Sequence, residues 1–134
     1  MTHSTHPSPP NIPTSPNTRW VNLDEASAVS SEGLHPYEIP YTSLAPSSPL
    51  EGSLNLLVVH HEGALYALHD ECPHRRIKLS EQGYAEGEWV VCGWHGWRFK
   101  LETGEHMIPT GNCVQTYPVA LHHERLWVAL PISF

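Results

Sequence analysis

Short apolar runs separated by turn residues constrain the fold of this chain more than any other feature of its sequence. Residues 54–61 (LNLLVVHH) and residues 64–70 (ALYALHD) flank Glu62-Gly63, and two β-rich runs around a glycine-bearing turn predict a β-hairpin. Four later runs repeat the pattern at close spacing, at residues 88–94, 97–101, 113–121 and 125–130. Because no helical period extends beyond a turn or two, the sequence predicts an all-β fold, an antiparallel sandwich or barrel.

Prolines support this prediction, because the 134 residues include 13 prolines, which disfavour long helices. Pro36 and Pro40 fall within residues 35–41 and cannot donate to a sheet ladder, so this segment is predicted to be an edge strand. Residues 24–33 predict a loop or one weak helical turn, and residues 45–53 predict a turn. The chain length predicts a single domain.

The N-terminal segment differs in composition from the rest of the chain. Residues 1–18 contain five prolines and one aliphatic residue after Met1, which is too little apolar surface to offset the entropy of ordering. We therefore predict a disordered Pro/Ser/Thr-rich tail over residues 1–18 and a folded domain over residues 19–134.

Charge and hydropathy exclude several classes of function. Seven Lys and Arg against 14 Asp and Glu give a net charge of −7, which disfavours binding to nucleic acid or to an anionic membrane. No stretch approaches the roughly 18 apolar residues needed to cross a bilayer, and the N-terminus lacks the features of a secretory signal. Three cysteines cannot all pair, so we expect reduced thiols, free to bind metal, in a cytoplasmic protein.

Two Cys/His pairs carry the chemistry that the sequence predicts. They are Cys72-Pro73-His74 and Cys92-Gly93-Trp94-His95, with 17 residues between them. Two thiolates and two imidazoles suit a tetrahedral metal ion or an iron–sulfur cluster and disfavour calcium or magnesium. Zinc and iron–sulfur chemistry both remain open at this point, although structural zinc usually prefers C-x2-4-C and H-x3-5-H pairs.

The flanking residues resemble one family closely. Residues 71–105 (ECPHRRIKLSEQGYAEGEWVVCGWHGWRFKLETGE) are similar to the Rieske family, in which a C-x-H box and a C-x-x-H box hold one [2Fe–2S] cluster. The preceding hairpin and the later YPV at residues 117–119 extend the resemblance over residues 19–134. It implies a Rieske-type fold whose small cluster-binding subdomain is formed by two loops, at about residues 70–100.

The resemblance also implies the ligands of the cluster and its redox range. Cys72 and Cys92 would hold the inner iron, and His74 and His95 the outer, more exposed iron. Two neutral imidazoles in place of two thiolates make the cluster less negative, so it accepts an electron more easily than an all-cysteine cluster.

Respiratory members of the family carry an extra disulfide and hydroxyl groups beside the cluster, both of which raise the potential. Those positions here read Ile77, Trp94, Trp97 and Phe99. We therefore predict a potential at the low end of the family range, below roughly 0 mV.

Other side chains near the boxes are weaker candidates. Arg75, Arg76 and Arg98 either give the cluster a positive surrounding or form salt bridges with Asp70, Glu71 or Glu102. Trp94 and Trp97 either shield the cluster from water or pack in the core. Cys113 is predicted to be a buried structural thiol. We expect solvated histidines at the ends of strands or in turns, namely His60, His61, His122 and His123. His69 and His106 could pack near the cluster, but nothing in the sequence selects them.

The sequence predicts an electron-transfer component of an oxidoreductase system rather than an enzyme by itself. Only 21 residues follow Cys113, which leaves no room for the mononuclear iron domain of a Rieske oxygenase. Neither a nucleotide-binding glycine fingerprint nor a flavin motif is present, so electrons must arrive singly.

The resemblance implies a ferredoxin that passes electrons from a flavin-dependent reductase to a terminal oxygenase, such as a dioxygenase, or to another redox enzyme. Two alternatives remain. One is a Rieske-like small subunit of a larger enzyme such as assimilatory nitrite reductase, and the other is a structural zinc-binding module.

Overall fold

The computed structural model describes residues 8–93, 96–108 and 111–132. Ten strands and three single-turn helices make up the secondary structure of these residues. The strands are β1 (Thr18–Glu25), β2 (Gly33–Pro40), β3 (Ser53–His61), β4 (Ala64–His69), β5 (Gly83–Glu86), β6 (Trp89–Cys92), β7 (Trp97–Lys100), β8 (Thr116–Tyr117), β9 (Val119–His122) and β10 (Arg125–Pro131). The helices are the 3-10 turn η1 (Ala26–Val29), α1 (Tyr41–Leu44) and α2 (Leu79–Gln82).

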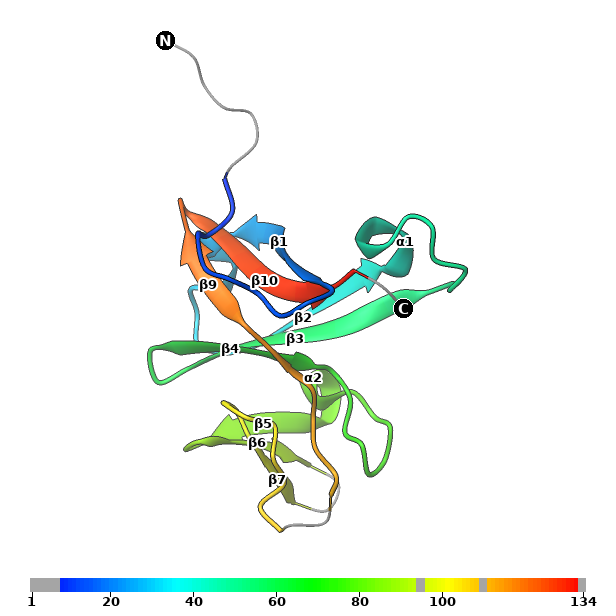
Figure 1. The fold of residues 1–134 in the computed structure, drawn as a ribbon. Coiled ribbons are helices and arrows are strands. Elements are labelled where there is room, and N and C mark those ends of the chain that lie inside the picture. The colour runs from blue at the N-terminus through cyan, green and yellow to red at the C-terminus, as the bar shows by residue number, and fades with distance from the viewer. Residues whose placement is uncertain (1–7, 94–95, 109–110, 133–134) are drawn as a thin grey trace.

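The strands form three antiparallel sheets, which confirms the all-β prediction. Their orders are β1-β10-β9, β2-β3-β4-β8 and β5-β6-β7. Figure 1 shows the first two sheets facing each other, with the small β5-β6-β7 sheet at the end of the molecule remote from the N-terminus. The first box lies between β4 and α2, before this small sheet, and the second begins at Cys92, the last residue of β6, and leads to β7 within the sheet.

The β3–β4 hairpin confirms the clearest prediction from the sequence. Glu62 and Gly63 form its turn with φ of 52° and 80°, as a two-residue turn that follows the twist of its strands requires. β2 pairs with β3 and lies at the edge of its sheet, where Pro36 and Pro40 are tolerated.

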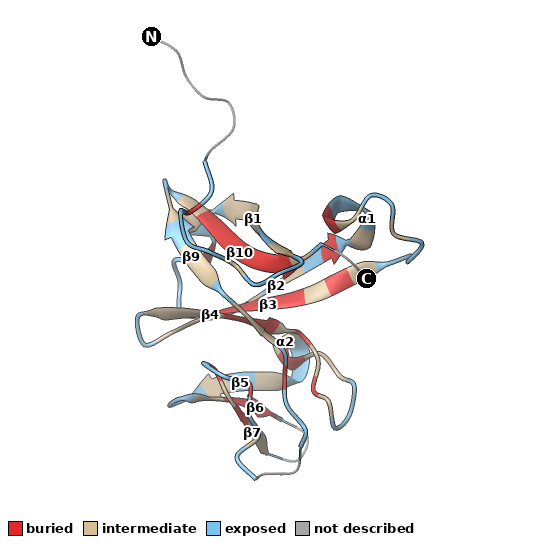
Figure 2. Cartoon of the chain, viewed as in Figure 1, coloured by how far each residue is buried: buried red, intermediate tan, exposed pale blue. Residues whose placement is uncertain are grey.

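Strand β3 separates two hydrophobic clusters. Its side chains alternate between faces. Leu56 and Val58 therefore enter the cluster between the two larger sheets, and Leu57 and Val59 enter the cluster between the four-stranded sheet and the small sheet. Figure 2 shows this strand buried over most of its length. A strand buried on both faces explains why residues 56–59 are a continuous apolar run.

Some elements differ from the sequence prediction. The run at residues 113–121 is divided at Pro118 into β8, which pairs with β4, and β9, which pairs with β10, so the chain crosses there from one sheet to another. α2 and β5 had no clear signal, because residues 79–86 are mostly polar or half-exposed.

The predicted N-terminal tail is described from Ser8 onward. In this part of the chain the Trp20 indole Nε1 donates to the Ile12 carbonyl at 2.9 Å, and the Ile132 amide donates to the Asn17 carbonyl at 2.9 Å. The tail over residues 1–18 stays a prediction. No helix among the described residues is long and apolar enough to span a membrane.

Candidate metal centre

A buried carboxylate closes the loop that carries the first Cys/His pair. Asp70 follows β4, is 2% exposed, and accepts hydrogen bonds from the Ser80 amide at 2.8 Å and from the Ser80 hydroxyl. Ser80 lies in α2, so these two bonds tie the end of β4 to α2 and close the loop between them. A buried charge needs such partners, because an unpaired one would be costly.

Within this loop the backbone turns tightly around Cys72. The Cys72 amide donates to the Ile77 carbonyl at 2.8 Å, and the Arg76 amide donates to the Cys72 carbonyl at 2.7 Å. Arg76 has φ of 55°, a left-handed conformation that reverses the chain. The turn buries Cys72 and leaves His74, Arg75 and Arg76 exposed at the tip.

The second loop begins where β6 ends at Cys92. Gly93 donates its amide to the Gln82 carbonyl at 2.8 Å, and a Cβ at this position would lie 2.1 Å from the same oxygen, so only glycine fits. Gly96 returns the chain with a bond from its amide to the Cys92 carbonyl at 3.0 Å. Trp94 and His95 lie outside the described residues.

The two loops bring two buried thiols together. Cys72 is 0% and Cys92 is 1% exposed, and neither forms a disulfide. Burial raises the pKa of the Cys72 thiol, and a hydrogen bond with Cys92 adds to the rise, whereas the backbone amides of His74 and Arg75 lower it by donating to the sulfur. Two adjacent thiols with amide donors suit one iron of a Rieske cluster, since that iron is held by two cysteines.

The predicted ligand His74 lies at the surface, where its ring stacks flat on Trp97. Their ring centroids are 3.9 Å apart and their planes differ by 2°. Among the described residues no three His, Cys, Asp or Glu side chains form a group that could hold an ion. The described part of the site therefore comprises the Cys72–Cys92 pair and the separate His74–Trp97 stack.

Two further aromatic residues extend this stack. His106 stacks on Trp97 at 4.3 Å and packs against the buried Phe99 at 5.1 Å. Trp97 is half-buried and contacts the apolar cluster between the four-stranded sheet and the small sheet, so it both packs in the core and covers His74. The sequence allowed His106 to pack near the cluster without selecting it; the ETGE turn, which folds the chain back toward Phe99, is the signal that could have selected it.

Of the arginines near the boxes, Arg98 forms an ion pair, but with a partner other than Asp70, Glu71 or Glu102. This partner is Glu86 of β5, the strand on the far side of β6 from β7, and the nitrogen to oxygen distance is 3.2 Å. Each of the two carboxylate oxygens of Asp70 accepts a hydrogen bond from Ser80. Arg75 and Arg76 lie exposed at the loop tip beside His74.

Cys113 was predicted to be buried and is exposed. It lies in the loop before β8 and forms an isolated bridge with Glu105, and the buried apolar residue of this segment is its neighbour Val114. The segment is loop where the apolar pattern suggested strand, so the thiol faces out.

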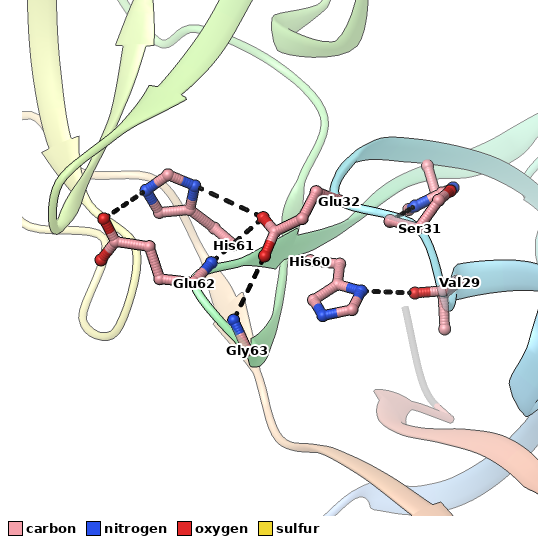
Figure 3. A network of polar contacts seen from close by, with 8 residues as sticks. Val29, Ser31, Glu32, His60, His61, Glu62 and Gly63 are labelled. Carbon is pink, nitrogen blue, oxygen red and sulfur yellow. Dashed lines mark hydrogen bonds and ion pairs between the residues drawn. The ribbon is translucent and has the colours of Figure 1, made fainter.

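Two of the histidines expected in solvent are held by other groups. Figure 3 shows His61 between Glu32 and Glu62 and His60 beside Val29. The nitrogen to oxygen distances from His61 to Glu32 and Glu62 are 3.9 and 3.7 Å. The Nδ1 atom of His60 donates to the Val29 carbonyl at 2.9 Å. The His61 side chain is 19% exposed. The β3–β4 turn packs against the segment before β2, because the Glu62 and Gly63 amides donate to the Glu32 carboxylate.

The fold and the paired thiols define a small all-β protein with two buried cysteines side by side, and comparison with known proteins identifies its family. The family model for the Rieske [2Fe-2S] domain matches residues 20–118. The chain therefore belongs to the Rieske [2Fe–2S] domain family, and its cofactor is a [2Fe–2S] cluster.

Several relatives are components of oxygenase systems. The ferredoxin component of an alkene monooxygenase system from Xanthobacter autotrophicus is 31% identical over 77 residues, which cover 58% of this chain and 63% of that protein. The ferredoxin component of a naphthalene 1,2-dioxygenase system from Pseudomonas putida is 31% identical over 97 residues, 66% of this chain and 92% of that protein. The chain thus spans less than two thirds of the first relative.

The fold is also found in solved structures. A chain in the complex of reduced oxygenase and oxidized ferredoxin of carbazole 1,9a-dioxygenase superposes with a TM-score of 0.62. It is 22% identical, and the match covers 82% of this chain and 92% of that chain. The likeness shows a shared fold.

Proposed function

We propose that this protein is a one-electron carrier of ferredoxin type that receives electrons from a flavin-dependent reductase and passes them to a terminal oxygenase. The observation that carries the proposal is the pair of buried thiols, Cys72 and Cys92, directly beneath a loop tip that exposes His74. Ferredoxin components of oxygenase systems among the relatives, and a ferredoxin–oxygenase complex among the structures of the same fold, support it.

In this proposal Cys72 and Cys92 hold the inner iron, and His74 and His95 hold the outer iron. The cluster takes up and returns one electron without further chemistry. The protein keeps the sulfur side dry, because both cysteines are at most 1% exposed, and it leaves the imidazole side accessible at His74. The exposed imidazole edge is then the shortest route for an electron to a bound partner.

The surface around His74 suits brief contacts with a partner. Arg75 and Arg76 lie exposed beside His74, whereas the whole chain carries a net charge of −7. A local positive region on an acidic protein can orient its docking, and small interfaces allow a carrier to dissociate between rounds. We propose that the reductase and the oxygenase bind this loop tip in turn.

We also propose a low potential, below roughly 0 mV. The positions where respiratory members supply a disulfide or hydroxyl groups are here apolar, and of those described Phe99 is fully buried and Trp97 half-buried. The reduced cluster therefore lacks stabilisation from those groups. The three unpaired cysteines suit a reducing compartment, and we propose a cytoplasmic location.

Anaerobic purification followed by transient kinetics tests the proposal. The protein should be coloured, contain iron and acid-labile sulfide, accept one electron from a flavoprotein reductase, and be reoxidised by a terminal oxygenase of the relatives' type. Gel filtration should give a free small protein. Permanent association with a larger enzyme would instead favour a fixed subunit, and a colourless protein without iron would refute the proposal.

A substitution at His95 tests the ligand set separately. His95→Cys should lower the potential of the cluster, because a thiolate adds negative charge beside the iron. His123→Cys is the matched control, since His123 is exposed in the turn between β9 and β10, far along the chain from both boxes. Equal potentials in His95→Cys and wild type, with the cluster intact, would contradict ligation by His95.

A further inference from the structure

Three stacked rings connect the first loop to the strand that follows the second loop. His74 lies flat on Trp97, with centroids 3.9 Å apart and planes within 2°. His106 stacks on the same indole at 4.3 Å, with an angle of 28° between the planes. Such an arrangement fixes the orientation of one ring by that of the next.

Trp97 is anchored to the part of the fold that carries the second loop. It is the first residue of β7 and lies opposite Cys92 in the β6–β7 pair. Its indole also packs against the apolar cluster between the four-stranded sheet and the small sheet, and its ring centroid lies 6.4 Å from that of the buried Phe99. The position of the indole is therefore set by β6 and β7.

His106 is held beside Trp97 by the turn after β7. The Lys100 amide donates to the Glu105 carbonyl at 2.8 Å, and the Met107 amide donates to the Arg98 carbonyl at 3.0 Å. His106 itself forms a bridge with Phe99, and its Nδ1 donates to the Ile108 carbonyl at 2.9 Å. The backbone on both sides of His106 is thus tied to β7.

His74 differs, because it lies in the exposed tip of the first loop. The χ2 torsion of histidine is broad, so an exposed imidazole rotates easily unless a neighbour restricts it. Metal-bound histidines in proteins are generally oriented by such outer partners. No disulfide ties the two loops together, since all three cysteines are free. Stacking on Trp97 is a contact that links the first loop to β7.

We propose that Trp97 is a positioning residue for His74, and that His106 supports the Trp97 indole. This inference rests on the proposed function, in which His74 is an iron ligand. Stacking then holds the imidazole parallel to the indole, ties the first loop to β7, and limits the access of water to the outer iron.

Substitutions of Trp97 test this inference by spectroscopy of the loaded protein. In Trp97→Leu the His74 ring should take several orientations. The distribution of its nitrogen couplings, measured by pulsed electron paramagnetic resonance, should therefore become broader than in wild type. The potential should rise, because water near His74 favours the more negative, reduced state. Trp97→Phe keeps a ring for stacking and should restore both values toward wild type.

A tryptophan of the neighbouring strand serves as the matched control. Trp89 is half-buried in β6, and its ring lies 6.0 Å from the Lys100 ammonium. Trp89→Leu removes a similar area of indole and should leave the couplings and the potential as in wild type. His106→Leu should broaden the couplings, but less than Trp97→Leu does.

The outcomes separate this inference from the proposed function. Wild-type couplings and potential in Trp97→Leu would overturn the inference while leaving the electron carrier intact. If Trp97→Leu loses its cluster, the variants His106→Leu and Trp97→Phe test the inference. A wild-type spectrum in His106→Leu would overturn the role of His106 in supporting the indole. Broadened couplings in His106→Leu but not in Trp97→Phe would uphold the inference. A wild-type protein without nitrogen couplings would contradict the proposed ligands themselves.

Discussion

Asp70→Ala should lower the free energy of unfolding by about 3–6 kcal/mol, because it removes two hydrogen bonds to a charged group, each contributing about 1.5–3 kcal/mol. Asp70 is 2% exposed, and its carboxylate accepts hydrogen bonds from both the amide and the hydroxyl of Ser80. Ser80→Ala removes the hydroxyl but keeps the amide, so it should cost about half as much. A loss of this size is a large part of the stability of a small domain, about 5–15 kcal/mol.

Urea unfolding of the loaded protein, followed by circular dichroism and by cluster absorbance, measures these losses. Glu71→Ala is the matched control, because Glu71 is the next residue along the chain and is only half-buried. The double variant Asp70→Ala, Ser80→Ala should cost little more than Asp70→Ala alone, since both changes remove the same bond. Losses in Asp70→Ala no larger than in Glu71→Ala, or simple additivity in the double variant, would refute the reasoning.

Three further predictions concern the frame around the site. Gly104→Ala should destabilise the fold, because Gly104 has φ of 78° and a Cβ there would lie 1.8 Å from the Val114 carbonyl oxygen; thermal unfolding checks this. Leu57→Ala should cost about 2–5 kcal/mol in denaturant unfolding, whereas Leu121→Ala, at a side chain 54% exposed, should cost far less. Burial raises the pKa of Tyr117 to about 12, above its ordinary value of 10.0. The resulting stabilisation is complete below pH 10 and is lost as the pH rises to about 12; in Tyr117→Phe this part of the pH dependence of stability should be absent.

Local patterns allowed the sequence to predict much of the fold. The β3–β4 hairpin follows from two apolar runs and a turn that Gly63 can adopt, and the edge position of β2 follows from its prolines. The adjacency of Cys72 and Cys92 was expected from a family resemblance. Each of these features depends on residues that are close in sequence or on a motif with fixed spacing.

Contacts that close the loops were not predicted, because no sequence pattern records them. The Asp70–Ser80 bonds depend on how the loop after β4 folds back, and the stack of His106 on Trp97 depends on how the turn after β7 does. Cys113 was placed in a buried strand because an apolar segment follows it, yet the strand begins only at Thr116. A single sequence shows apolar runs, but it does not show where a loop ends and pairing starts.

Pulsed electron paramagnetic resonance of the reduced wild-type protein tests the central claim most directly. A cluster held by two cysteines and two histidines should be paramagnetic after one-electron reduction and should show couplings to two imidazole nitrogens. Labelling only histidine with ¹⁵N should change both couplings. A reduced protein with a [2Fe–2S] signal but no histidine nitrogen coupling, or one with no signal at all, would contradict the account.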